Sequence, residues 1–259
     1  MGKPKHPKVY SKNQINKIKE CGKIVAEVLT VCAIKTTEGM STYDVDMMVK
    51  NFLKHHKATS ASFGYKGFPG YSCISVDEVI LHGIPSKDKI LEEGMIVGID
   101  CPVKYKGMIA DSAINIKIGE VDESKSKLNE VAEKCLYSTL DMIGPGVTIG
   151  EICKYQEEYA KEHGYKVIKD FRGHGVGKNL HEPPYIPYYY DENNPYNDYK
   201  LKVGNVIAIE PTLVTNDLTV KLPDEWGVVT SDMSFGTSWE HTVVITDNGK
   251  EIVTKTDII

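Results

Sequence analysis

Two stretches decide the fold: LEEGMIVGID at Leu91–Asp100 and LKVGNVIAIE at Leu201–Glu210. Leucine, glycine and a final pair of isoleucine and acid recur in the same register, 110 residues apart (91 to 201). Each stretch is typical of a short turn followed by an apolar strand that ends in a carboxylate. A chain that carries the same strand twice is predicted to contain two related halves.

Other segments recur in the same order around these strands. A helix start with the spacing of a capping box occurs at GMSTYDV (39–45) and again at GVTIGEI (146–152). LHGIP (81–85) is echoed by LHEPP (180–184), and longer helical patterns follow Ser11 and cover roughly 124–143. We therefore predict an α+β fold made of two helix and antiparallel-sheet halves related by a pseudo-twofold axis. The acid-ended strands would then meet in a shared central cleft.

The predicted organisation is an N-terminal tail (1–10) followed by a single domain (11–259), with half-repeats at about 11–120 and 121–259. The opening MGKPKHPK is expected to be solvated. The second half is longer by 11 residues, because the echoes are offset by 99 and then by 110 residues. The excess falls in YIPYYYDENNPYNDY (185–199), whose composition predicts an inserted surface loop, with a partner contact as the alternative.

Composition excludes several classes of protein. The 259 residues carry a net charge of −5 with no long basic run, which disfavours nucleic acid as the main ligand. The six cysteines form no CxxC pair, and no apolar run is long enough to cross a membrane. We expect a cytoplasmic protein with reduced thiols, no membrane partner and a monomeric state.

Four acidic residues lie at or inside apolar strands. Asp100 precedes a turn at 104–107 and a returning strand with Asp111. A hairpin centred on residues 105–106 would place Asp100 opposite Asp111, because the numbers of paired residues would then sum to 211. If one strand were shifted by two residues along the other, both aspartates would still lie on the same face of the sheet, since side chains alternate between the faces. Glu210 ends its strand, and Glu240 lies on a later one. Any one of these acids could be solvated or paired with an arginine. Only Arg172 is close to these strands in the sequence, however, so a bound metal is the simplest explanation for the charge balance of all four acids.

A histidine ligand is predicted from FRGHGVGKNLHEPP (171–184). Gly173, Gly175 and Gly177 surround His174 in the sequence, and the thin backbone is expected to allow close approach of a ligand. One histidine with several carboxylates favours Mn, Fe, Co or Zn, and three or more carboxylates suggest two bridged ions. A structural metal site is disfavoured because such sites are usually closed and rich in cysteine.

These residues resemble the type I methionine aminopeptidases, metallopeptidases of the pita-bread fold. The resemblance covers nearly the whole chain and lies in five motifs: GYKGFPGYSCISVDEVILHGIP, GIDCPVKYKGMIADSA, GHGVGKNLHEPP, IAIEPTL and WEHTVVITDNG. It implies a dinuclear metal cleft whose ligands are Asp100, Asp111, His174, Glu210 and Glu240. In that arrangement Asp111 and Glu240 bridge two divalent ions, and a metal-bridged hydroxide attacks the first peptide bond.

The resemblance also implies the substrate and the roles of further residues. The expected activity is removal of the initiator methionine from nascent proteins and peptides, with a small second residue and with the ribosome as a possible partner. Glu210 would carry a proton, His181 would donate to the carbonyl oxygen, and His82 would contact the scissile nitrogen. The methionine pocket would be formed by Tyr65, Phe68, Cys73, Trp226 and the nearby Leu180.

Some departures and rivals stay open at this point. Phe68 stands where the family often has tyrosine, and Leu180 where an aromatic residue is frequent, so side-chain preference is in doubt. Asp77 lies in a region that can hold a monovalent cation. A proline-directed relative of the same fold is a rival, although such enzymes usually carry a sizeable N-terminal domain. A metal-free binding module is another, but it would be expected to have lost ligands.

Overall fold

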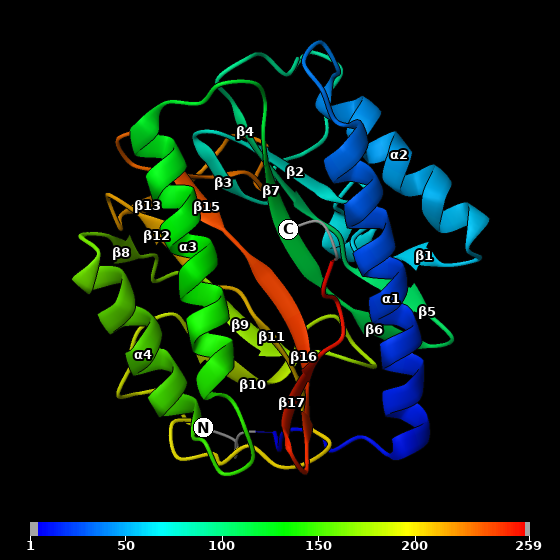
Figure 1. Cartoon of the computed structure of the whole chain (residues 1–259), viewed down its shortest axis with the longest axis vertical. Coiled ribbons are helices and arrows are strands. Elements are labelled where there is room, and N and C mark those ends of the chain that lie inside the picture. Colours follow the sequence, from blue (N-terminus) through cyan, green and yellow to red (C-terminus); the bar gives the residue numbers. More distant parts are fainter. Residues whose placement is uncertain (1–4, 257–259) are drawn as a thin grey trace.

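The computed structural model describes residues 5–256 and has an α+β architecture in which helices cover a central antiparallel sheet (Figure 1). Residues 1–4 of the predicted tail and 257–259 of the predicted domain lie outside the described residues. The helices are α1 (Lys12–Lys35), α2 (Thr42–His55), α3 (Glu123–Met142) and α4 (Ile149–Glu162), with a 3₁₀ turn at Tyr65–Gly67. Within residues 5–256, no helix is both long and apolar enough to span a membrane.

The central sheet has the order β10-β9-β11-β16-β7-β4-β2, with β17 paired to β16. Its strands are β2 (Cys73–Val76), β4 (Ile96–Asp100), β7 (Ser112–Lys117), β9 (Arg172–Gly175), β10 (Glu182–Pro187), β11 (Val206–Ile209), β16 (Glu240–Thr246) and β17 (Gly249–Ile252). The order is symmetric about the β16–β7 pair: β7, β4 and β2 come from the first half, and β16, β11 and β9 from the second. The predicted meeting of the two acid-ended strands follows from this order.

Three small sheets complete the fold, in the orders β1-β5-β6, β15-β12-β8 and β13-β14-β3. Their strands are β1 (Thr59–Ser60), β3 (Val79–Leu81), β5 (Val103–Tyr105), β6 (Met108–Ala110), β8 (Lys166–Val167), β12 (Thr212–Val214), β13 (Thr219–Lys221), β14 (Val228–Thr230) and β15 (Gly236–Ser238). The third of these sheets joins the halves, because β3 belongs to the first half and β14 to the second.

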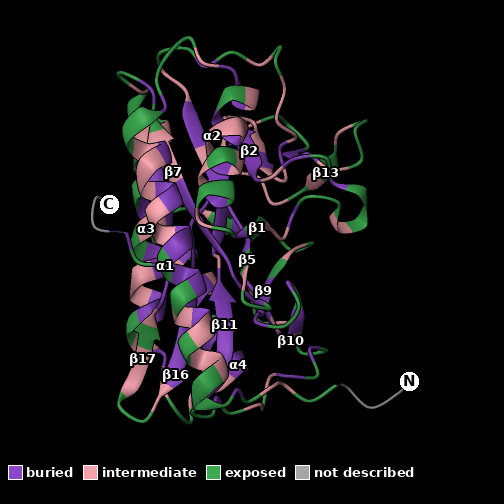
Figure 2. Ribbon diagram, turned by 90° about the vertical axis from the view of Figure 1, so that its right-hand side faces the viewer, coloured by how far each residue is buried: buried purple, intermediate pink, exposed green. Residues whose placement is uncertain are grey.

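The helix starts agree with the sequence pattern. Ser11, Ser41 and Thr148 are N-caps of complete capping boxes, in which the residue three positions later returns a side-chain hydrogen bond. The third helix begins at Glu123 after the N-cap Asp122, one residue earlier than predicted. All four helices gather on one side of the sheet, where their buried faces form the main core with it (Figure 2).

The recurring glycine has the same physical role in both halves. Gly94 and Gly204 turn the chain with φ of +89° and +91°, a conformation that glycine adopts without steric cost. Each glycine donates its N–H to the far end of a neighbouring strand, to the carbonyl of Ile118 at 2.8 Å or of Ile245 at 2.9 Å. The repeated sequence therefore encodes a repeated turn that aims each strand at the cleft.

Two sequence-based predictions need correction. The predicted pairing of the hairpin is shifted: the numbers of paired residues sum to 213 and not 211, since Val103 pairs with Ala110 and Asp100 pairs with Ala113. The slide is two residues, so Asp111 stays on the face that carries Asp100. The prediction of a surface loop at 185–199 is wrong for two of its tyrosines: Tyr188 is fully buried and Tyr196 is 6% exposed.

Residues 5–10 run along the body of the protein. The side chains at Lys5 and His6 are exposed, as expected of a solvated tail. The backbone is nevertheless held, because Tyr196 donates to the carbonyl of Lys5 at 3.0 Å and Asn205 donates to that of Lys8 at 2.7 Å. Tyr10 at the end of the segment is buried.

Candidate metal centre and substrate pocket

The sheet register places the predicted ligands in two adjacent rows. Asp100 and Glu240 both pair with Ala113, on β4 and β16. The pairing of Ile209 with His241 puts the next residue, Glu210, beside Glu240 in the same row. The second row lies two residues away, on the same face of the sheet.

The second row holds the other two predicted ligands. His174 on β9 pairs with Ala208, which pairs with Thr242 on β16. Thr242 accepts the N–H of Asp111 at 2.9 Å through its hydroxyl, so Asp111 ends the row. Five neighbouring strands thus each deliver, or directly adjoin, one of the five residues.

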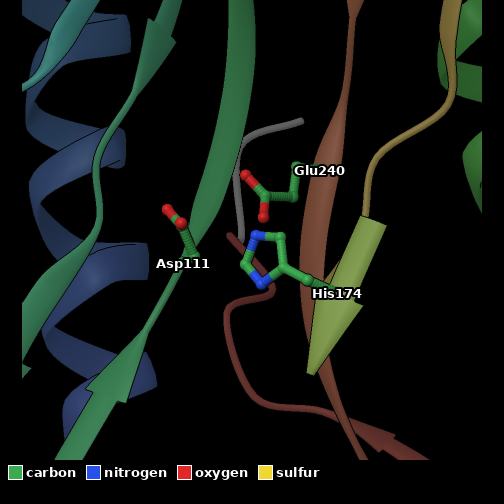
Figure 3. A group of neighbouring side chains, drawn as sticks. All are labelled: Asp111, His174 and Glu240. Atoms are coloured by element: carbon green, nitrogen blue, oxygen red, sulfur yellow. The ribbon is translucent and has the colours of Figure 1, made fainter. Parts of the chain in front are cut away.

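Three of these side chains converge tightly. Asp111, His174 and Glu240 each offer a ligand atom, and these atoms all lie within 4.8 Å of one another. Figure 3 shows the three side chains reaching toward a common space from separate segments. All three residues are buried, at 3–5% exposure. The charge of Asp100 raises the pKa of Asp111, so the cluster extends toward β4.

The cluster has an excess of negative charge. Burial raises the pKa of Asp100 to about 6 and that of Glu210 to about 8. Burial, followed by the charges of Asp100 and Glu210, raises the pKa of Asp111 well above its ordinary range, and Glu240 is shifted in the same direction by burial and its acidic neighbours. Burial also lowers the pKa of His174 to about 4, so its ring is neutral and able to ligate.

The donor set fits divalent metal ions. One oxygen each of Asp100, Asp111 and Glu240 is buried without a hydrogen-bond partner in the described part of the chain. The neutral His174 ring places Nε2 3.4 Å from Glu210 Oε1, and no lysine or arginine of residues 5–256 pairs with these carboxylates. Buried acids that lack both cations and donors are stabilised by bound metal, and a mixture of imidazole and carboxylate suits transition metals.

The cluster lies at the floor of a cavity of about 590 Å³. The wall of the cavity includes every residue that the sequence predicted for the site: His82, His181, Tyr65, Phe68, Cys73, Trp226 and Leu180, together with the five acid and histidine residues of the cluster. His174 and His181 approach edge to face with ring centroids 4.3 Å apart. A peptide end that entered this cavity would meet the acids, both histidines and an apolar wall together.

Comparison with known proteins identifies the family. The model of Metallopeptidase family M24 matches residues 16–247. A methionine aminopeptidase of Clostridium acetobutylicum is 36% identical over 247 residues, covering 95% of this chain and 98% of that protein. The chain belongs to the methionine aminopeptidases of metallopeptidase family M24.

Solved structures agree with this assignment. The crystal structure of a methionine aminopeptidase from Thermotoga maritima matches with a TM-score of 0.92 and 35% identity, covering 96% of this chain and 100% of that one. A prolidase from Pyrococcus furiosus matches with a TM-score of 0.76 and 27% identity, covering 96% of this chain and 66% of that one. The fold is the pita-bread fold of M24, and this methionine aminopeptidase family member is a metal-dependent hydrolase.

Within this family member, the glycines beside His174 also serve the packing of the sheet. A side chain at Gly173 would come within 2.7 Å of the carbonyl oxygen of Ala208, and one at Gly175 within 2.3 Å of that of Pro183. The glycines therefore allow neighbouring strands to approach His174 closely.

Two residues of the site were missed from the sequence. Phe171 lines the cavity and packs edge to face on His82, with ring centroids 5.3 Å apart. The hydroxyl of Tyr188 donates to Glu210 Oε2 at 2.7 Å from beneath the cluster. Phe171 carried a signal, since it stands three residues before His174, but nothing local distinguishes Tyr188 from its neighbouring tyrosines.

Two predicted residues have notable surroundings. His82 adopts a left-handed backbone conformation with φ of +56°, which is strained for a residue with a side chain and is typical of functional sites. The carboxylate of Asp77 pairs with Lys125 at 3.0 Å and accepts the N–H of Ile96 at 3.1 Å. Asp77 therefore already has a protein counter-ion.

Proposed function

We propose that this protein removes the N-terminal methionine from peptides and nascent proteins, with two divalent ions held by Asp100, Asp111, His174, Glu210 and Glu240. The observation that carries the proposal is the convergence of these residues, two further histidines and an apolar wall on one cavity. The family assignment supplies the substrate class. Mn, Fe, Co and Zn all suit the donor set.

The ligand assignment follows the two rows. Asp111 and Glu240 lie between His174 on one side and Asp100 on the other, which supports a bridging role for both. Glu210 and His174 would complete the ligand set of one ion, and Asp100 would complete that of the other. Such a pair of ions supplies Lewis acidity and lowers the pKa of water toward neutrality.

The protein's own side chains would orient the substrate and move protons. The apolar wall of Phe68, Cys73 and Trp226 receives the methionine side chain and excludes water from it. His181 is placed to donate to the carbonyl oxygen as negative charge grows there, and His82 to contact the scissile nitrogen. Glu210 would carry a proton from the attacking water to the leaving amine, as a carboxylate placed among the predicted ligands can act as a general base and acid.

The proposal extends to a monomer in the cytoplasm that acts on chains as they leave the ribosome. The net charge of −5 gives no reason to invoke nucleic acid as a main ligand. A monovalent cation is left out of the proposal, since Asp77 is paired with Lys125.

The deciding experiment measures methionine released from Met-Ala-Ser and Met-Lys-Ser by the metal-free protein with added Mn or Co, and again with EDTA. We expect cleavage of Met-Ala-Ser alone, abolished by EDTA. Glu210→Gln should bind the tripeptide and keep its fold, yet lose about 100-fold or more in kcat.

Two other outcomes would redirect the proposal. Release of the first residue from an Xaa-Pro peptide, with Met-Ala-Ser left intact, would favour the proline-directed relatives. Metal binding without hydrolysis of either peptide would favour a binding module.

A further inference from the structure

The tyrosine-rich stretch at 185–199 reaches the metal centre through one side chain. Tyr188 follows directly after β10 and is fully buried, although its neighbour Tyr190 is 40% exposed. The Tyr188 hydroxyl donates to Glu210 Oε2 at 2.7 Å. A buried phenol needs a hydrogen-bond partner, and here the partner is one of the predicted metal ligands.

The two oxygens of Glu210 have different surroundings. Oε1 lies 3.4 Å from His174 Nε2, on the side of the cluster. Oε2 points away from the cluster and accepts a hydrogen bond from the Tyr188 hydroxyl. Within residues 5–256, Tyr188 is the residue found to donate a hydrogen bond to the Glu210 carboxylate. A glutamate side chain has three rotatable bonds, so fixing one oxygen restricts where the other points.

The stretch that carries Tyr188 is itself tied down. Pro187 pairs with Arg172 at the edge of β9, two residues before His174. Beyond Tyr188, the N–H of Tyr190 binds the Glu157 carboxylate at 3.1 Å, and the N–H of Gly150 binds the carbonyl of Asn197 at 3.0 Å. The anchors on α4 and on the edge of β9 hold the tyrosine ring in place beneath the ligands.

We propose that Tyr188 is a positioning residue, which fixes the Glu210 carboxylate so that Oε1 faces His174 and the metal centre. The stretch at 185–199 is then a support for the site and not a surface decoration. This inference rests on the proposed function, because it takes Glu210 as a metal ligand. Residues that orient ligands typically contribute 10- to 100-fold to metal affinity or activity.

The test is Tyr188→Phe, which removes one oxygen atom and keeps the ring. The matched control is Tyr196→Phe, in the same stretch, whose hydroxyl binds the carbonyl of Lys5 at 3.0 Å, away from the cluster. Affinity for Mn would be measured by titration calorimetry on metal-free protein, and kcat and KM for Met-Ala-Ser at saturating Mn. We expect Tyr188→Phe to lose about 10-fold or more in affinity and in kcat with KM nearly unchanged, and the control to stay within about twofold.

A double-mutant cycle with Glu210→Ala, which removes the acceptor of the Tyr188 hydrogen bond, separates positioning from general damage. If Tyr188 acts through Glu210, adding Tyr188→Phe to Glu210→Ala changes Mn affinity by less than about twofold. An equal loss in both backgrounds would overturn the proposal, and so would wild-type affinity and kcat in folded Tyr188→Phe. Should Tyr188→Phe alone be too unstable to titrate, Glu210→Ala with and without added Tyr188→Phe is compared by unfolding midpoints at several Mn concentrations. If Mn shifts the unfolding midpoint by different amounts in these two proteins, the proposal is contradicted.

The outcomes are distinguishable from failure of the proposed function. Wild type that binds Mn and cleaves Met-Ala-Ser upholds the proposed function whatever Tyr188→Phe does. Wild type that binds no Mn and releases no methionine removes both proposals together.

Discussion

The rings of Phe68 and Trp226 meet edge to face on the wall of the cavity, with centroids 5.1 Å apart and planes inclined at 74°. Phe68 is buried at 3% exposure, whereas Trp226 is half-buried on the turn between β13 and β14. The tryptophan is therefore a part of the wall that is supplied by the second half and is more open to an incoming side chain than Phe68.

Trp226→Ala should weaken recognition of methionine without unfolding the protein. Burial of a methionine side chain contributes about 1.5–3 kcal/mol, and loss of roughly half of it corresponds to about a tenfold fall in kcat/KM. The measurement is kcat/KM for Met-Ala-Ser at saturating Mn. Leu218→Ala, at a residue 67% exposed just before β13, is the control. A value for Trp226→Ala within twofold of the control would remove Trp226 from the pocket.

The contribution of Asp100 and Glu210 to the stability of the metal-free protein should fall as pH rises. The buried histidines contribute in the opposite direction up to about pH 6.5, because burial lowers the pKa of a group such as His174 to about 4. Asp100 and Glu210 have pKa values raised from 3.8 and 4.5 to about 6 and about 8 in the folded state. A raised pKa means that the folded state binds the proton more tightly, so the contribution to stability is complete below about pH 4. It is lost as pH rises through 6 and then 8, at up to about 1.4 kcal/mol per pH unit for each group.

Urea unfolding in EDTA between pH 5 and pH 8 would measure this loss, with Glu210→Gln as the reference that lacks one titrating group. Added Mn should reverse the trend, because metal replaces the protons and its affinity rises with pH. Equal pH dependence of wild type and Glu210→Gln would show that Glu210 does not titrate in this window.

The acid cluster was predictable from the sequence because its placement depends on the two-residue alternation of side chains along a strand and not on the exact pairing of residues between strands. The hairpin was placed two residues out of register, and yet Asp100 and Asp111 fell on the same face, since side chains alternate along a strand. The repeated glycines carried the same kind of local information, because Gly94 and Gly204 occupy a conformation that other residues adopt at a cost.

Tyr188 could not be predicted in the same way. Tyrosine, asparagine and proline are typical of exposed loops, yet the Tyr188 ring is fully buried in the main hydrophobic core. Its partner Glu210 is 22 residues away, and no pattern within the stretch points to it. The packing role of Gly173 was equally hidden, since the carbonyl that it accommodates belongs to Ala208 on β11.

Tyr65→Phe should lower kcat through His181. The Tyr65 hydroxyl and His181 Nδ1 are 3.0 Å apart. With the hydroxyl as donor, the ring proton of His181 is on Nε2, where it is available to the substrate carbonyl oxygen. Loss of the hydrogen bond, about 0.5–1.5 kcal/mol, predicts a fall in kcat of about threefold to tenfold with little change in KM.

His181→Ala is the reference for this prediction. Tyr65→Phe should add almost nothing to the loss of kcat in His181→Ala, because the two residues act as one unit. Independent, multiplicative losses would show that Tyr65 acts on the substrate by another route.

Tyr10→Phe should destabilise the protein from the other end of the chain. The Tyr10 hydroxyl donates to Glu182 and accepts the N–H of Lys178 at 2.8 Å. Glu182 is 4% exposed, lies directly after His181, and also pairs with Lys8 at 2.5 Å. Removal of the hydroxyl takes one donor from a buried carboxylate, which costs about 1–3 kcal/mol.

For a chain of this size, that cost corresponds to a fall in Tm of roughly 2–10 °C, measured by thermal unfolding in EDTA. Tyr190→Phe, on a ring that is 40% exposed, is the control and should leave Tm unchanged. Because Glu182 adjoins His181, Tyr10→Phe should also lower kcat more than it raises KM. An unchanged Tm would mean that the Tyr10 hydroxyl contributes no net stability, and that Lys8 and Asn179 are enough to hold Glu182 and the turn that carries His181.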